Sequence, residues 1–252
     1  MMRIGLLGCG NIGNLLAANA DGFTIGAFYD LVPERAHRLA KRSEGVAFET
    51  FEAFVDAEVD LVVEAASNLA VRAHAEAVLR SGKDLVVMSV GGLADRTFRA
   101  RLREIALAER RKIYIPSGAV MGLDNLKVGR IGGIDTLVLR TTKSPASLGL
   151  EVGERTLVFR GRADECVQAY PKNVNVSIAL ALATGVEVQV ELWTDPDVDR
   201  NIHEILAEGP FGDAYLRIRN VPSPDNPATS YLAALSILVL LRDLGEPIVV
   251  GT

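Results

Sequence analysis

The chain has 252 residues, of which 49% are hydrophobic and 23% are charged, and its formal net charge is −5 at pH 7. This composition predicts a globular protein with an ample core, built as one large domain or as two smaller ones. The negative charge and the absence of a Lys/Arg block argue against a nucleic-acid partner.

The remaining composition bears on location and redox chemistry. The most apolar segment, residues 232–241, is far shorter than the ~20 residues of a membrane-spanning helix, so we predict a buried helix and no membrane partner. No signal peptide precedes the first expected strand, and Cys9 and Cys166 are too few for a disulfide framework. The expected location is therefore the reducing cytoplasm. Three histidines and two distant cysteines give no metal-ligand spacing, so no metal site is predicted.

A glycine-rich turn follows the first expected strand, residues 3–7, and a helix opens at residue 14. Its G-x-G-x-x-G spacing suits a dinucleotide. The first glycine permits a tight turn, the second lets the pyrophosphate approach the backbone, and the third lets the helix pack on the strand. The pyrophosphate then lies at the positive end of the helix. The predicted cofactor-binding residues of this turn are Gly8, Gly10, Asn11, Ile12 and Gly13.

The next expected strand, residues 23–29, ends at Asp30, which lies 17 residues after Gly13. A carboxylate at this position accepts hydrogen bonds from the adenosine ribose and repels a 2′-phosphate. Asp30 therefore predicts NAD as the cofactor in preference to NADP, while NADP stays possible.

Strand and helix patterns then alternate up to residue 115, which predicts a parallel sheet with right-handed crossovers. Helical patterns cover residues 36–42, 51–56, 71–80 and 97–110, and strand patterns cover 46–48, 59–64, 84–89 and 112–115. Small or polar residues follow three of these strands, at the sheet edge where ligands gather. The predicted cofactor contacts among them are Ala65, Ala66, Ser67, Ser89 and Ala119. Ordinary strand-to-helix turns are the alternative explanation.

After Ala119 the pattern changes to strands with period-two alternation, which predicts a mostly antiparallel sheet with one buried face. Strands are expected at 136–142, 156–160, 186–193, 203–208 and 215–220, a hairpin turn at 209–212, and helices at 163–169 and 174–184. Prolines 222, 224 and 227 predict a linker. We expect Thr229 to cap a helix over residues 230–243, and residues 248–250 to form a last strand.

The predicted fold is α/β: an N-terminal doubly wound Rossmann domain with an inserted α+β domain on a mostly antiparallel sheet. We assign residues 1–120, completed by 228–252, to the dinucleotide-binding domain and 121–227 to a catalytic and dimerisation domain.

The candidate acid–base group is His203, since imidazole moves protons near neutral pH and no other histidine follows residue 74. Alternation places it on the face of Ile205 and Ala207, so a packed core histidine is the alternative. Lys172, Asn173 and Asn175 precede or open a buried helix. These residues either cap the helix or bind ligands. In the second case, one asparagine amide holds the nicotinamide carboxamide and Lys172 binds a substrate carboxylate.

The second half carries recognisable motifs: Ser117-Gly-Ala119 with Gly122-Leu-Asp124, Pro171-Lys-Asn-Val-Asn-Val176, Asn201-Ile-His-Glu-Ile205 and Asn226-Pro-Ala-Thr-Ser-Tyr231. In this order they resemble the L-aspartate dehydrogenase family over essentially the whole chain. The resemblance implies NAD(P)-dependent oxidation of L-aspartate to iminoaspartate, which yields oxaloacetate and ammonia or enters NAD biosynthesis, and the reverse reductive amination. It also implies a catalytic His203, cofactor contacts by Ala119 and Asn173, and a homodimer formed through the second sheet.

Two other functions stay open on the residues alone. One is a different two-domain NAD(P)-dependent reductase, acting on a cyclic imine or a sugar. The other is an NAD-sensing protein without turnover, against which His203 argues because such a protein needs no acid–base group.

Overall fold

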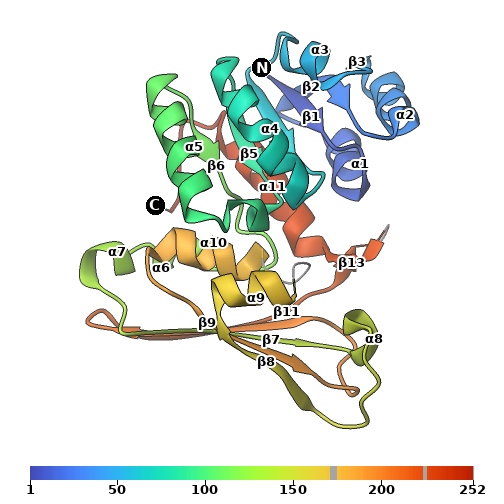
Figure 1. Ribbon diagram of the computed structural model, residues 1–252. Helices are drawn as coiled ribbons and strands as arrows, with labels where there is room; N and C mark the ends of the chain where they lie inside the picture. The colour runs from blue at the N-terminus through green and yellow to red at the C-terminus, as the bar shows by residue number, and fades with distance from the viewer. Residues whose placement is uncertain (171–174, 224–225, 252) are drawn as a thin grey trace. The chain divides into compact units, whose positions relative to one another are not determined.

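A computed structural model describes residues 1–170, 175–223 and 226–251. The chain divides into two compact units, one of residues 1–116 with 237–249 and one of residues 117–236 with 250–252. Each unit has its own sheet (Figure 1).

The first unit is built on a six-stranded parallel sheet in the order β3-β2-β1-β4-β5-β6, as the strand and helix alternation predicts. Its strands are β1 (Met2–Leu7), β2 (Phe23–Tyr29), β3 (Val46–Ala47), β4 (Leu61–Glu64), β5 (Asp84–Val87) and β6 (Ile113–Tyr114). The crossover between β1 and β4 is the point where ligands bind in sheets of this topology. In register, Leu7 pairs with both Tyr29 and Glu64, so the loops that follow β1, β2 and β4 meet at one edge.

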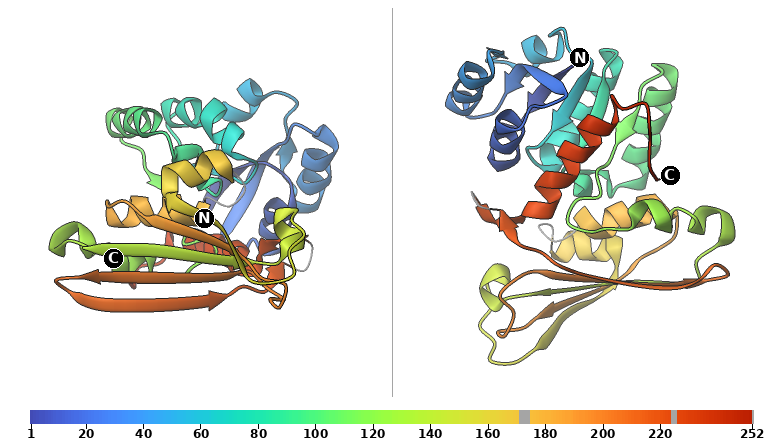
Figure 2. Two further views of the ribbon diagram at one scale, coloured as in Figure 1. Left: turned by 60° about the horizontal axis from the view of Figure 1, so that its bottom comes forward. Right: turned by 180° about the vertical axis from the view of Figure 1, so that it is seen from behind.

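Helices cover this sheet because their apolar residues recur with helical spacing. They are α1 (Asn11–Ala18), α2 (Pro33–Ser43), α3 (Phe51–Val55), α4 (Asn68–Arg80), the 3-10 turn Val90–Leu93, and α5 (Arg96–Ala108). The helix α11 (Tyr231–Asp243) begins in the second unit and ends in the first. Figure 2 shows it from behind, on the side of the sheet away from α4 and α5. Its Ile237, Leu238 and Leu241 join the buried cluster around β1 and β2.

The second unit is built on a five-stranded sheet in the order β11-β10-β7-β9-β8. Its strands are β7 (Thr136–Lys143), β8 (Thr156–Arg162), β9 (Gln189–Thr194), β10 (Ile202–Gly209) and β11 (Gly212–Arg219). The prediction of a mostly antiparallel sheet is confirmed, since β7 and β9 form its one parallel pair. The predicted hairpin at 209–212 joins β10 to β11.

The two faces of this sheet differ in chemistry. Period-two alternation buries Leu139, Val190 and Ile205 on one face, which we call the inner face. The helices α9 (Ala163–Ala169) and α10 (Asn175–Thr184) lie on this side (Figures 1 and 2). The outer face carries Arg140 and Glu191, and no helix within the described residues covers it.

Three short helices were not predicted: α6 (Leu123–Leu126), α7 (Gly129–Gly132) and α8 (Pro145–Leu148). The predicted proline linker is wrong at Pro222 and Pro227, because β12 (Pro222–Ser223) and β13 (Asn226–Ser230) form a two-stranded antiparallel ribbon, while Pro224 lies outside the described residues. A ribbon tolerates proline because one side of each strand has no neighbour to pair with. Thr229, the predicted cap, lies within β13.

The predicted last strand at 248–250 is wrong as well. Ile248, Val249 and Val250 form no strand and are 80%, 74% and 92% exposed. A β-branched run favours a strand only where another strand pairs with it.

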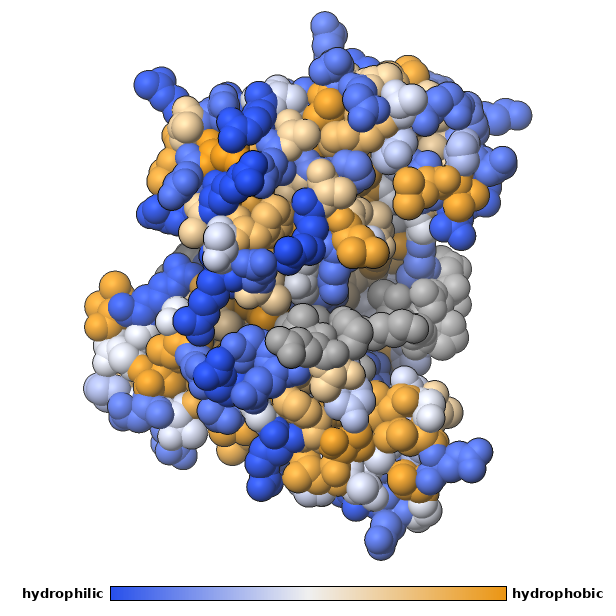
Figure 3. Space-filling model, in the orientation of Figure 1, coloured by the Kyte–Doolittle hydropathy of each residue, from blue (hydrophilic) through white to orange (hydrophobic). Residues whose placement is uncertain are grey.

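None of the described helices has both the length and the hydropathy to span a membrane. On the face seen in Figure 3, hydrophobic residues form separate groups among hydrophilic ones.

Candidate functional site

The three glycines of the turn after β1 differ in what surrounds them. Gly8 has a φ of +100°, and a Cβ there would lie 2.7–2.8 Å from backbone atoms of Ala65 and Ala66. A Cβ on Gly13 would lie 2.8 Å from the Gly8 carbonyl oxygen. A Cβ on Gly10 would meet nothing within 4 Å. Gly8 and Gly13 are therefore glycines for the fold, whereas the space at Gly10 fits a ligand that approaches the backbone.

Helix α1 begins directly after Gly10. Because this N-cap residue is a glycine, no side chain caps the first amide groups of the helix. Helix amide groups at such an end attract a phosphate. Among the other motif residues, Asn11 is half-buried and Ile12 packs against the core of this unit.

Asp30 lies at the end of β2 and braces this turn. Its Oδ2 accepts a hydrogen bond of 2.7 Å from the Cys9 amide, and its Oδ1 accepts one of 2.8 Å from the Val32 amide. Arg35 Nη1 lies 3.9 Å from Oδ1. The carboxylate is thus held beside the glycine turn.

A pocket opens at this edge of the sheet. Gly8, Gly10, Asp30, Ala65, Ala66 and Ser67, all predicted to bind the cofactor, line it together. Leu31 and Leu69 also line the pocket and are 86% and 78% exposed, so they give it an apolar wall that the sequence did not reveal. Such a wall suits an adenine ring.

His74, a half-buried residue of α4, also belongs to this pocket. Its ring stacks on Phe51 with centroids 3.9 Å apart. Burial lowers the pKa of His74, which favours the neutral ring.

Glu64 was missed by sequence reasoning, although an acid that ends an apolar strand is a signal for it. It is 1% exposed. Its Oε1 accepts hydrogen bonds from the Ala66 amide (2.8 Å), the Ser67 amide (2.9 Å) and Ser89 Oγ (2.9 Å), and its Oε2 accepts one from the Ser89 amide (2.9 Å). Burial raises the pKa of Glu64, and these four donors oppose the rise. The side chain ties together the loops after β4 and β5.

Two predicted contacts therefore already have partners within the protein. Ser89 donates to Glu64, and Ser67 caps α4 by accepting from the Ala70 amide at 3.1 Å. Both are half-buried or exposed, and either can also contact a ligand.

The cysteines offer no nucleophile. Burial and the charge of Asp30 raise the pKa of Cys9 to about 12, and burial raises that of Cys166 to about 11. Both thiols therefore stay protonated near neutral pH, which disfavours a thioester mechanism.

His203 lies on β10 in the second unit, on the inner face with Ile205 and Ala207. It is 7% exposed, and its Nδ1 lies 3.0 Å from Thr141 Oγ1 on the paired strand β7. Burial, with a contribution from the positive charge of Lys143, lowers the pKa of His203 to about 3. The ring is therefore neutral in the free protein near pH 7.

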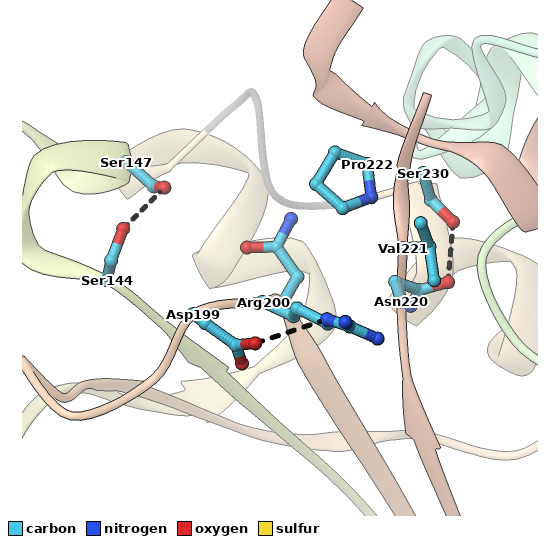
Figure 4. A pocket seen from close by; sticks show the side chains of 9 residues that line it. Ser144, Ser147, Asp199, Arg200, Asn220, Val221, Pro222 and Ser230 are labelled. Atoms are coloured by element: carbon cyan, nitrogen blue, oxygen red, sulfur yellow. Dashed lines mark hydrogen bonds and ion pairs between the residues drawn. The ribbon is translucent and has the colours of Figure 1, made fainter. Parts of the chain in front are cut away.

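A second pocket opens in this unit at the ends of β10 and β11. Ser144, Arg200, Asn201, Asn220 and Ser230 are among the polar residues that line it (Figure 4). Asn220 Nδ2 donates to the Ala119 carbonyl oxygen at 3.0 Å, which holds the loop of this predicted cofactor residue. The Arg200 guanidinium pairs with Asp199 at 3.2 Å.

The remaining residues predicted to bind cofactor or substrate lie within residues 172–175. Asn175 is the first residue of α10 and is exposed, whereas Lys172 and Asn173 lie outside the described residues. Among the described residues, no group of three or more His, Cys, Asp or Glu side chains could hold a metal ion.

Two family models match consecutive parts of the chain. Residues 8–116 match the family described as the NAD-binding domain of homoserine dehydrogenase, and residues 124–244 match the family described as the C-terminal domain of aspartate dehydrogenase. The chain is 56% identical to the L-aspartate dehydrogenase of Methanospirillum hungatei over the full length of both. It is 44% identical to that of Methanothermobacter thermautotrophicus, covering 100% and 99% of the two chains.

A solved structure is also similar to this chain. The aspartate dehydrogenase of Thermotoga maritima superimposes with a TM-score of 0.86 at 29% identity, over 100% of both chains.

The parallel sheet with its glycine turn, open at Gly10, and the acid at the end of β2 define an NAD(P)-dependent oxidoreductase of the Rossmann type. The similarity over the whole length narrows that class. The chain belongs to the L-aspartate dehydrogenase family.

The open space at Gly10 yields a prediction that separates folding from binding. Gly10→Ala should leave the free energy of unfolding within about 1 kcal/mol of wild type, because its Cβ meets no atom. It should weaken NADH binding by about 10-fold or more, because charge-assisted contacts to the pyrophosphate are lost. Fluorescence titration with NADH and urea unfolding measure the two effects.

Gly8→Ala is the matched control. Its Cβ collides with backbone at a positive φ, so it should lower the free energy of unfolding by about 2 kcal/mol or more. Wild-type NADH affinity in Gly10→Ala would contradict the assignment of the turn.

Proposed function

We propose that the chain oxidises L-aspartate with NAD(P) to iminoaspartate, and catalyses the reverse reductive amination. The carrying observation is a buried, neutral His203, held by Thr141, in a chain similar over its whole length to proteins named L-aspartate dehydrogenase. The substrate is thus a small dicarboxylic amino acid.

The pyrophosphate is held by the turn of Gly8, Gly10 and Gly13, supported by Asn11 and Ile12. Asp30 binds the adenosine ribose. Ala65, Ala66, Ser67 and Ser89 contact the cofactor beyond the strand ends, while Ala119 and Asn173 hold the nicotinamide. When bound, NAD(P) accepts the hydride that leaves the aspartate Cα.

His203 acts on the proton side of the reaction. We assign the tautomer in which Nδ1–H donates to Thr141 Oγ1, so that Nε2 keeps its lone pair and removes a proton from the water that attacks the imine carbon. In the reverse direction the protonated ring returns that proton to the departing hydroxyl.

Two carboxylates of the substrate need cationic or N–H donors. We assign one to Lys172, with Asn175 as a further polar contact at the start of α10.

The direct test is absorbance at the NADH band with L-aspartate and either cofactor. We expect turnover with aspartate and a lower KM for NAD than for NADP, because the Asp30 carboxylate repels a 2′-phosphate. A panel of cyclic imines and polyols is the control. Turnover of one of these without turnover of aspartate would contradict the proposal.

His203→Ala should lower kcat for aspartate by about 10²–10⁴-fold, the usual contribution of general acid–base catalysis. The dissociation constant of NADH should change little, because the residue serves the proton step. His37→Ala, which removes an exposed histidine of the first unit, is the matched control and should keep wild-type kcat. Weaker NADH binding with unchanged kcat in His203→Ala would refute the role.

We further propose a homodimer formed through the outer face of the second sheet. Leu206 pairs with Val138 and Tyr215 on the neighbouring strands, and these side chains form an apolar row across that face. Tyr215 is 56% exposed within one chain. An exposed row of this kind, bordered by arginines and glutamates, is typical of an interface.

Leu206→Glu should convert the dimer to a monomer, because it places a charge in the centre of that row. Sedimentation equilibrium measures the mass. Leu107→Glu, the same change at an exposed leucine of α5, should leave the dimer intact. A monomeric wild-type protein, or a dimeric Leu206→Glu, would rule out this interface.

A further inference from the structure

The inner face of the second sheet becomes polar at one end. On that face the rows of buried Leu139, Leu192 and Ile205 continue into four polar side chains: Thr141 and Lys143 on β7, Thr194 on β9 and His203 on β10. Thr141 pairs in register with His203, and Lys143 pairs with Thr194. Thr141, Thr194 and His203 are 4%, 0% and 7% exposed, and Lys143 is half-buried.

Lys143 has no counter-ion in the part of the chain that the structure describes. No Asp or Glu of the described residues lies within 4.0 Å of its ammonium group, and burial alone lowers the pKa of Lys143. By contrast, Arg140 on the outer face pairs with Glu191 at 2.8 Å, and Arg200 in the nearby pocket pairs with Asp199 (Figure 4). A desolvated cation without a partner is unfavourable in the free protein, so its presence on this face points to an anionic ligand.

Thr194 provides a second and independent observation. Its hydroxyl oxygen is buried and has no hydrogen-bond partner among the described residues. Neighbouring strands lie about 4.8 Å apart, so this hydroxyl and the Lys143 side chain start from adjacent positions on the same face. An ammonium group beside a hydroxyl donor forms a site for a carboxylate.

We infer that Lys143, together with Thr194, binds a carboxylate of the substrate beside His203. The inference rests on the proposed function and extends it. Lys172 was assigned to one of the two substrate carboxylates, and Lys143 with Thr194 would bind the other. It makes Lys143 a specificity residue for dicarboxylic substrates. It also explains why a cation lies beside the base: the substrate itself supplies the compensating negative charge.

The test compares Lys143→Met, which keeps the length of the side chain without its charge, with Lys143→Arg and with Lys112→Met. Lys112 is exposed in the first unit and serves as the matched control. The measurements are the KM for L-aspartate, the inhibition constants of succinate and propionate, the dissociation constant of NADH and the melting temperature.

Lys143→Met should raise the KM for aspartate and the inhibition constant of succinate about 10- to 100-fold, the usual loss for a charged hydrogen bond. NADH affinity should stay unchanged, and succinate should lose its advantage over propionate. Lys143→Arg should restore part of the succinate affinity, and Lys112→Met should match wild type.

Thr194→Val, which is close in shape, keeps the inference falsifiable if Lys143→Met does not fold, and it should raise the succinate constant several-fold. An active Lys143→Met with wild-type constants for aspartate and succinate overturns the inference and leaves the proposed function standing. An unchanged succinate constant in Thr194→Val overturns it equally. A wild-type protein that neither oxidises aspartate nor binds succinate overturns both.

Discussion

The contact between Gly8 and the backbone of Ala65 and Ala66 constrains the whole first unit. It requires a residue without a Cβ, in a left-handed conformation, at the end of β1. Parallel pairing places Leu7 opposite Tyr29 and Glu64, so the turns after three strands converge on this point. The pocket, the position of Asp30 and the start of α1 all follow from that convergence.

Buried carboxylates and cations are used in different ways by the two units. Glu64 is satisfied entirely by donors of its own chain, and it therefore stabilises the loops of the pocket. Lys143 and Thr194 have no such partners among the described residues, and their unmet requirements point to a ligand. Polar groups that are buried without partners mark function more sharply than those that are satisfied.

The local sequence pattern predicted the structure correctly where one short segment contains the residues that both form the element and carry its chemistry. The glycine turn, Asp30 and the alternation around His203 are of this kind, and the parallel and mostly antiparallel sheets are confirmed. It failed at residues 248–250 and at the proline segment, because pairing with another strand decides both. The stacking of His74 on Phe51 could not be predicted in this way, because the two residues are distant in sequence.

The amino-acid order alone established the dinucleotide fold, the family resemblance and the candidate histidine, since each rests on residues close together along the chain. Three-dimensional packing alone revealed the hydrogen bonds of Glu64, the apolar wall of the pocket and the lack of a counter-ion for Lys143 among the described residues. Burial and hydrogen-bond partners are properties of strands brought together from distant positions, and no local pattern records which partner a side chain will lack.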